Sequence, residues 1–429
     1  MLNTIVELLN KAKVYAWSVT AQKTRGWEFY FIRHALDQNR VRDVEHFTVT
    51  VYQQIEDGKY VGSASAELHP TSSPEEAAAL IDSLAYRATL VKNEPFTLVP
   101  AYEEEKESAA PIDTAAIAAD FLSTMKSLPE TETEDINSYE LFVSEKTTRV
   151  LNSNGLDVSD RAAASMLEVI VNARRGGHEI ELYRAFTSGS CDAEGLRREL
   201  VKAMATGRDR LQTRPTPNLG KADVLFSTKA ACDIYYFFLA RLDAANIYHK
   251  FSDWQPGVPI AEDVRGDKVS VRTLRSLPNS SANARHDAEG SRVRETLLME
   301  DDVPQRFIGS RRYSCYLGLE DSFIPGNVAF SGGTHTEEEL RKGPYLEAVE
   351  FSDFQVDDMT GDVFGELRLG YWHDGEKVIP VSGGSVSGSM FDYLKAMEMS
   401  AAQTQYNRFL IPSLTLLRGV TVTGAEKEE

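Results

Sequence analysis

Cysteine is scarce in this sequence. Only three occur in 429 residues, Cys191, Cys232 and Cys315, and no two of them form a CxxC pair. The number is odd, and the spacing fits neither a disulfide framework nor a zinc ribbon. A disulfide-stabilised secreted scaffold is therefore not indicated, and a reducing compartment is expected.

Long hydrophobic runs are also missing. No stretch approaches the ~18 uninterrupted apolar residues that a membrane-spanning helix needs. The opening segment, residues 1–17, has a helical period interrupted by polar residues and no small-residue cleavage site, so we interpret it as a first helix and not as a signal peptide. These features predict a cytoplasmic protein without membrane contact.

Basic residues are outnumbered. The chain has 46 Lys and Arg against 65 Asp and Glu, a net charge of −19. Because nucleic-acid binding depends on Lys and Arg that neutralise phosphates, direct binding to nucleic acid is disfavoured. Hydrophobic residues at 42% and charged residues at 26% are close to the average of soluble globular domains, which excludes wholesale disorder and collagen-like repeats.

Helix and strand patterns alternate in the first part of the chain. Apolar residues at helical spacing from Leu2 to Leu9 predict an opening amphipathic helix. The dipeptide Asp57-Gly58 is typical of a hairpin turn between strands. The Ser-Pro-Glu-Glu run at Ser73 predicts a helix to Ala88, with a serine cap and acids in the first turn. Strand-like runs are expected at 27–32, 46–52 and 59–66.

The pattern then becomes mostly β until residue 186. An acidic connector is expected at 102–108 and a charged solvated loop at 130–135, on either side of a helix that Asp113 caps and that runs through Leu128. Three strand-like arms follow, at 139–151, 165–175 and 179–186, and then a helix at 192–211.

A segment rich in Pro and Gly, residues 213–220, predicts a domain boundary. Beyond it we expect a strand at 223–226, a long helix at 228–248, a helix at 390–399 and otherwise strands, ending with 409–423. The prediction is an α+β fold. Residues 1–215 would form a domain of helices on a mostly antiparallel sheet, and residues 221–429 a β-rich, barrel-like or sandwich domain with few helices.

Three groups of residues are candidates for chemistry. His178-Glu179 resembles the start of a zinc motif, but no second histidine follows, and the alternating pattern favours a strand edge. The turn His286-Asp287-Ala288-Glu289-Gly290 could bind a substrate amine or a metal, or its carboxylates could cap backbone N–H groups.

Two glycine pairs form the third group, Gly332-Gly333 and Gly383-Gly384. Glycine lets a peptide backbone approach closely, although both pairs could equally be turns between strands. Neither pair fits a nucleotide-binding pattern. Cys232, in a run of apolar and aromatic residues, is expected to be a buried structural thiol.

Several motifs, taken in order, resemble the TldD/PmbA family, once called modulators of DNA gyrase. They are the Asp57-Gly58 hairpin with the helix at Ser73, the strand end 149–155 (RVLNSNG), the strand-to-helix join 223–231 (DVLFSTKAA), the acidic turn 286–290 (HDAEG) and the strand 360–365 (TGDVFG). Together they cover most of the chain.

The resemblance implies a cytosolic metallopeptidase with two kinds of subunit. TldD-type chains carry a zinc-binding HExxxH motif in the helix after the join, whereas TldE/PmbA-type chains lack it and pair with a TldD-type chain. Here the matching helix, 231–242, has no His-Glu pair and no second histidine, and His249 comes too late to complete the motif. The chain therefore resembles the TldE/PmbA type, with no cofactor of its own and zinc expected in a TldD-type partner.

The leading hypothesis is an auxiliary, non-catalytic subunit that helps such a hydrolase to degrade unfolded or small peptides. It would hold the peptide near Gly332-Gly333 and Gly383-Gly384, with His286, Asp287 and Glu289 as further substrate contacts. One alternative is a divergent peptidase, active alone as a homodimer, with metal ligands drawn from His249, His286, Asp287 and His335. Another is a regulatory protein that binds DNA gyrase, its acidic surface mimicking DNA.

Overall fold

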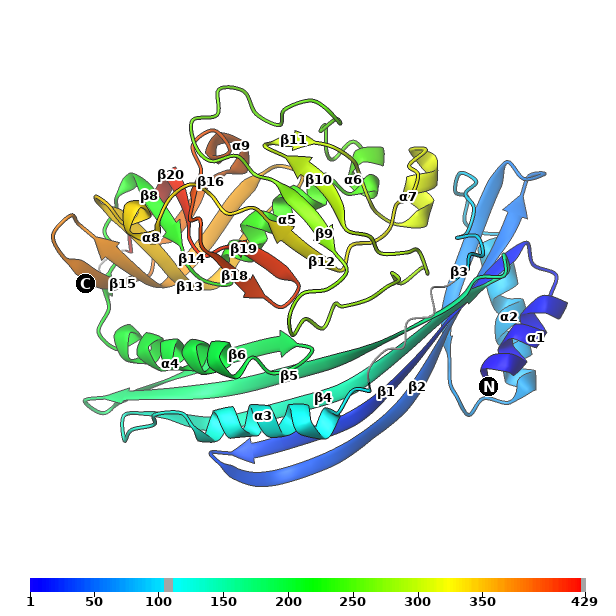
Figure 1. Ribbon diagram of the computed structural model, residues 1–429, viewed down its shortest axis with the longest axis horizontal. Coiled ribbons are helices and arrows are strands. Elements are labelled where there is room, and N and C mark those ends of the chain that lie inside the picture. Colours follow the sequence, from blue (N-terminus) through cyan, green and yellow to red (C-terminus); the bar gives the residue numbers. More distant parts are fainter. Residues whose placement is uncertain (104–110, 426–429) are drawn as a thin grey trace.

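A long, curved antiparallel sheet forms the amino-terminal part of the molecule (Figure 1). The computed structural model describes residues 1–103 and 111–425. The sheet has six strands in the order β3-β2-β1-β4-β5-β6. These strands are β1 (Ala16–Ile32), β2 (Ala35–Ile55), β3 (Tyr60–Leu68), β4 (Glu134–Asn152), β5 (Asp157–Arg175) and β6 (His178–Ser188). His178 and Glu179 begin the edge strand β6, as the alternating pattern predicts.

Strands β1 and β2 extend well beyond their predicted cores. β1 has 17 residues and β2 has 21, joined by a tight turn in which Arg33 has a φ of 54°. The residues in the middle of these strands are charged, so the alternation of apolar and polar residues that predicts a strand is lost there. The charged side chains pair with one another across the strands. Asp43 of β2 lies 3.8 Å from Lys23 and 3.2 Å from Arg25. The register of the hairpin thus continues through a polar middle.

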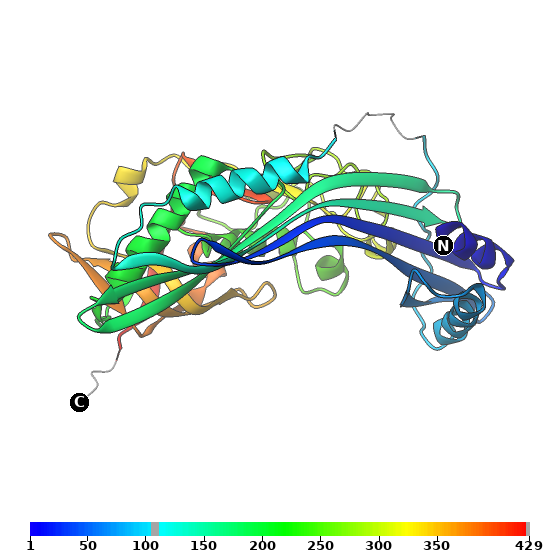
Figure 2. The same ribbon diagram turned by 90° about the horizontal axis from the view of Figure 1, so that it is seen from below.

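Two pairs of helices cover the sheet at its two ends (Figure 2). They are α1 (Leu2–Lys11) with α2 (Pro74–Ala88), and α3 (Thr114–Lys126) with α4 (Ala193–Arg210). Each pair packs on apolar side chains from alternate strand positions. Val19, for example, lies opposite Val49 of β2 and Leu151 of β4. The helix starts follow the sequence, because Ser73 and Glu76 form a capping box and Asp113 caps α3. Of the expected connector, residues 104–108 lie outside the described residues.

The carboxy-terminal part is β-rich and barrel-like, so the predicted α+β fold class is confirmed. One of its sheets has the order β11-β10-β9-β12-β19-β18 and the other the order β13-β8-β20-β16-β14-β15-β7. The strands are β7 (Arg214–Pro215), β8 (Gly220–Phe226), β9 (Val271–Leu274), β10 (Thr296–Glu300), β11 (Val303–Pro304), β12 (Asn327–Phe330), β13 (Tyr345–Val356), β14 (Asp362–His373), β15 (Val378–Ser382), β16 (Ser385–Ser389), β17 (Glu398–Met399), β18 (Gln403–Tyr406), β19 (Phe409–Pro412) and β20 (Thr415–Thr423).

Short helices complete this part. They are α5 (Ala231–Arg241), α6 (Ala244–Tyr248), α7 (Arg311–Tyr316), α8 (Glu337–Leu340) and α9 (Met390–Tyr393). Among the described residues, no helix is both long and apolar enough to cross a membrane. The division into domains 1–215 and 221–429 stays a proposal. The proposed boundary falls between α4 and β8. Strand β7, which precedes it, pairs with β15 of the carboxy-terminal part.

Two helices differ from the prediction. The single helix expected at 228–248 is broken in two, because Asp243 is extended and its carboxylate caps α6 through the Ala245 N–H at 2.8 Å. The helix expected at 390–399 ends at Tyr393, and Glu398 and Met399 pair with β20 instead. Asp243 also forms an isolated β-bridge with Ile308, so in both places pairing with a distant segment overrides a local helical pattern.

Candidate functional site

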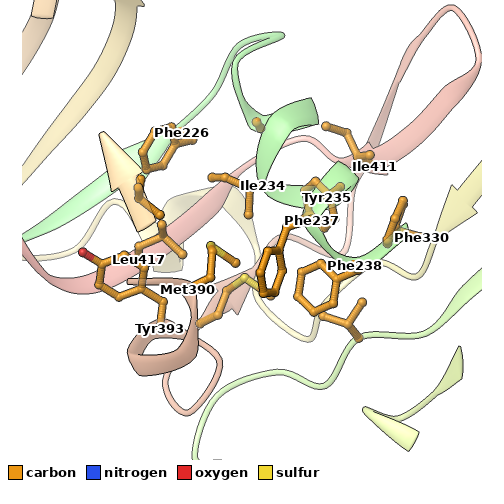
Figure 3. Close-up of a cluster of buried hydrophobic side chains, with 14 of the residues drawn as sticks. Phe226, Ile234, Tyr235, Phe237, Phe238, Phe330, Met390, Tyr393, Ile411 and Leu417 are labelled. Atoms are coloured by element: carbon orange, nitrogen blue, oxygen red, sulfur yellow. The ribbon is translucent and has the colours of Figure 1, made fainter. Parts of the chain in front are cut away.

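Helix α5 lies in the centre of the carboxy-terminal core (Figure 3). Its side chains Ile234, Tyr235, Phe237 and Phe238 are fully buried. The Tyr235 ring centroid lies 4.8 Å from that of Phe330, and its hydroxyl lies 2.7 Å from the Thr415 hydroxyl. Burial raises the pKa of Tyr235 far above its ordinary value. The aromatic face of this helix is therefore core packing.

The residues of α5 do not fit a catalytic zinc ion. Such an ion takes about three protein ligands and keeps an open position for water. Among His, Cys, Asp and Glu donors the helix offers only Cys232 and Asp233, which is fewer than three, and burial raises the pKa of the Cys232 thiol to about 12. Within residues 1–103 and 111–425, no three His, Cys, Asp or Glu residues are grouped so that they could hold a metal ion.

His286 joins the carboxy-terminal part to the long sheet. Its side chain is buried, and its Nδ1 lies 2.7 Å from Oδ2 of Asp160 on β5. Oδ1 of Asp160 accepts from the backbone N–H of Arg285 at 3.1 Å. Burial raises the Asp160 pKa, but the bonds from His286 and Arg285 outweigh it and leave the pKa below its ordinary value. The sequence offered no signal for Asp160, which lies 126 positions from His286.

The carboxylates of Asp287 and Glu289 bind backbone N–H groups. Asp287 Oδ1 accepts from Ser291 at 2.8 Å, and its Oδ2 accepts from Ile324 at 2.8 Å. Glu289 Oε2 accepts from the N–H of Arg311 at 2.6 Å. Burial raises the pKa of both carboxyls. These contacts match the capping alternative, and the role of the two residues toward a substrate stays a prediction.

Both glycine pairs approach the chain's own backbone. A Cβ on Gly333 would lie 2.2 Å from the Met399 carbonyl oxygen, and a Cβ on Gly332 would lie 2.5 Å from that of Ala401. Gly383 and Gly384 have φ values of 76° and 75°, in the turn between β15 and β16. Because the pairs face different segments, the structure does not join them into one surface, and their contact with a peptide stays a prediction.

The remaining histidines of the metal hypothesis have separate partners. His335 Nε2 lies 3.7 Å from Asp267 Oδ2 and 4.0 Å from Glu398 Oε2. Asp267 already accepts from the Met399 N–H at 2.6 Å. His249 Nε2 lies 3.1 Å from the Tyr313 hydroxyl, within a cluster of aromatic rings. His249, His286 and His335 are therefore held by different neighbours.

Two hollows open on the surface of the carboxy-terminal part. One, of about 310 Å³, is lined by residues that include Lys221, Asp223 and Trp372. The other, of about 240 Å³, is lined by residues that include Trp254 and Phe391. None of the predicted substrate-binding residues lines either hollow.

Comparisons with known proteins agree with this architecture. The family model described as the PmbA/TldA metallopeptidase C-terminal domain matches residues 219–424. A metalloprotease of Methanothermobacter thermautotrophicus is 24% identical over 284 residues, which is 59% of this chain and 60% of that protein. An uncharacterized protein of Methanocaldococcus jannaschii is 18% identical over 62% of this chain and 64% of its own length. The chain thus matches less than two thirds of either relative.

Solved structures share the whole fold. TldE from Thermococcus kodakarensis is similar with a TM-score of 0.77 and 16% identity, over 99% of this chain and all of that one. A proposed modulator of DNA gyrase from Thermotoga maritima is similar with a TM-score of 0.72 and 18% identity, over 99% of each chain. At such low identity these likenesses establish the fold alone.

Proposed function

Because the chain is a member of the TldD/PmbA family by its carboxy-terminal domain, we propose that it is a TldE/PmbA-type subunit. It would act as the non-catalytic partner of a TldD-type chain in a cytosolic metallopeptidase that degrades unfolded or small peptides. The observation that carries this proposal is the composition and burial of α5. Where TldD-type chains have metal ligands, this helix has buried aromatic side chains.

The packing of α5 argues against a hidden metal centre on this helix. The fully buried rings of Tyr235, Phe237 and Phe238 fill the space between the sheets. A polar or charged ligand in this setting would have to lose its hydration, which is unfavourable without a partner. The zinc that the family chemistry requires is therefore assigned to the TldD-type partner, and this chain supplies surface and substrate contacts.

Holding peptide in an extended form is the physical role that suits such a subunit. An extended chain can be bound through main-chain hydrogen bonds, which tolerate many side chains. Sequence-tolerant binding is what degradation of unfolded peptides needs. We keep His286, Asp287, Glu289 and the two glycine pairs as proposed substrate contacts, although their described hydrogen bonds are to the chain itself.

Metal content and turnover test this proposal together. The isolated chain and its mixture with a TldD-type chain that carries HExxxH are analysed for zinc per chain and assayed on a general peptide substrate. We expect no stoichiometric zinc and no turnover in the isolated chain. We expect both in the mixture, with loss on chelation and recovery on addition of zinc. One tightly bound zinc per isolated chain together with turnover would instead favour the alternative of a peptidase that is active by itself.

A further inference from the structure

Arg408 is a shielded arginine that has no counter-charge among residues 1–103 and 111–425. It lies in the turn between β18 and β19, and its Nε is buried and has no hydrogen-bond partner. Within the part of the chain that the structure describes, its guanidinium makes no hydrogen bond or ion pair. The other arginines there that lack such a bond have exposed side chains. Arg408 is thus an exception in a chain with 65 acidic residues.

The charges around Arg408 do not neutralise it, which is the setting that a bound anion would complete. Burial lowers the pKa of Arg408, and the one opposing influence is the phenol of Tyr236. No carboxylate of the described residues is among the causes that act on this pKa. A shielded charge without a partner is costly and is normally paired or hydrogen-bonded. An anion that binds here would supply the missing partner and remove this cost. The free energy recovered in this way would favour binding.

The turn holds Arg408 in a fixed position. Asn407 adopts a left-handed φ of 50°, which asparagine tolerates better than most residues. Its Oδ1 accepts from the Ser281 N–H at 3.0 Å, and its Nδ2 donates to the Ser281 hydroxyl at 3.0 Å. The Arg408 guanidinium carbon lies 5.0 Å from the centroid of the Phe409 ring. A guanidinium fixed in this way loses little entropy on binding.

This turn lies where the carboxy-terminal part meets the amino-terminal layer. Figure 1 shows the β18–β19 hairpin directed toward β6 and α4. Burial raises the pKa of Tyr406, at the start of the turn, and Glu199 of α4 and Cys232 of α5 raise it further. Tyr236 on α5 is half exposed. Tyr406 therefore lies near groups from both parts, and Arg408, in the turn that follows it, lies near Tyr236 of α5.

We propose that Arg408 binds a carboxylate of an extended peptide, with the Tyr236 hydroxyl as a second donor. A guanidinium presents parallel N–H donors that match a carboxylate, which a point charge cannot do. Both the terminal carboxylate of a peptide and an Asp or Glu side chain have this chemistry. The inference rests on the proposed function only in taking the ligand to be a peptide.

Binding of labelled peptides to the isolated, full-length chain tests the site. Three fluorescent peptides of one extended sequence are compared by anisotropy: a free acid, a terminal amide, and a terminal amide with Glu as its last residue. The variants are Arg408→Gln, Arg408→Lys and, as a matched control, Arg368→Gln. Arg368 is an exposed arginine on β14. Thermal unfolding checks that each variant is folded, and Arg408→Gln should be no less stable because it removes an unpaired charge.

The expected result is a preference for carboxylate that depends on Arg408. Hydrogen bonds to charged groups correspond to about 10-fold to 100-fold in affinity, so the free acid should bind wild type that much more tightly than the amide. Arg408→Gln should bind both at the affinity of the amide, Arg408→Lys should keep part of the preference, and Arg368→Gln should match wild type. The Glu-containing amide tells a general carboxylate site from one specific for the chain terminus.

Three outcomes would overturn the inference: equal binding of acid and amide by wild type, an unchanged preference in Arg408→Gln, or no binding of either peptide. Equal binding would leave the proposed peptide-holding function in place. Zinc and turnover in the isolated chain, together with an intact acid preference, would remove the auxiliary role but keep the carboxylate site.

Discussion

Nδ1 of His286 lies 2.7 Å from Oδ2 of Asp160, and this contact fastens the carboxy-terminal part to the long sheet. The backbone N–H of His286 donates to the same oxygen at 3.0 Å, and Arg285 donates to the other oxygen. One carboxylate thus collects several donors from a single turn. The turn that sequence patterns suggest as a substrate contact is also part of the link between the two layers.

Asp160→Asn should weaken this link. The amide cannot accept on both of its side-chain atoms, so we expect a loss of about 2 to 3 kcal/mol in the free energy of unfolding. Asp157→Asn is the control, because Asp157 lies on the same strand as Asp160 and its exposed pair with Arg149 of β4 should contribute under about 1 kcal/mol. Urea unfolding measures both. Equal losses would show that Asp160 is no more than a surface acid.

Asp302 should make stability depend on pH. Burial raises its folded-state pKa to about 6 from an ordinary value of 3.8, and its Oδ2 is buried without a partner. A carboxyl whose pKa is raised on folding favours the folded state when protonated. Its destabilising effect is therefore absent below about pH 4, full above about pH 6, and close to 3 kcal/mol.

Asp302→Asn isolates that contribution. The difference in unfolding free energy between the variant and wild type should grow as pH rises from 4 to 7, because only wild type acquires the buried charge. Urea titrations at several pH values give this difference directly. A difference that stays constant with pH would mean that folding does not raise the pKa of Asp302. The nearby exposed Asp301 provides the comparison through Asp301→Asn.

Tyr235→Phe should cost about 1 to 2 kcal/mol, because it leaves the fully buried Thr415 without its 2.7 Å hydrogen bond. Tyr236→Phe removes a hydroxyl from a half-exposed ring on the same helix and should leave stability within about 0.5 kcal/mol of wild type. Denaturant midpoints compare the two. Similar effects would argue against a core position for the Tyr235 hydroxyl.

Gly333→Ala tests what the Gly332-Gly333 pair is for. The new Cβ would meet the Met399 carbonyl oxygen at 2.2 Å, so the backbone there must shift and the chain should lose well over 1 kcal/mol. Gly343→Ala is the control, because nothing lies within 4 Å and only a φ of 79° is strained, at about 1 kcal/mol. If Gly333→Ala is as stable as Gly343→Ala, the close backbone approach at Gly333 does not require glycine, and the pair must be explained by another role.

Features that depend on neighbouring residues could be predicted from the sequence, whereas features that depend on contacts between distant residues could not. The cap at Ser73 and the turn at Asp57-Gly58 depend on neighbouring residues and were predictable. The full lengths of β1 and β2 were not, since their charged middles are satisfied only across strands. The Asp160–His286 contact joins positions 126 apart and leaves no local pattern. Arg408 shows the same limit, because a missing partner is visible only once the fold is known.

The long sheet also has a consequence for cooperativity. Its two helix pairs cover two separate apolar cores, one around α1 and α2 and the other around α3 and α4. Between them the strands are joined mainly by backbone hydrogen bonds and by charge pairs such as Lys23–Asp43. One end of the sheet can therefore unfold locally while the other end stays folded. The two ends then act as separate cooperative units, although the same strands run through both. Hydrogen exchange should be slow at both ends and faster near Arg25.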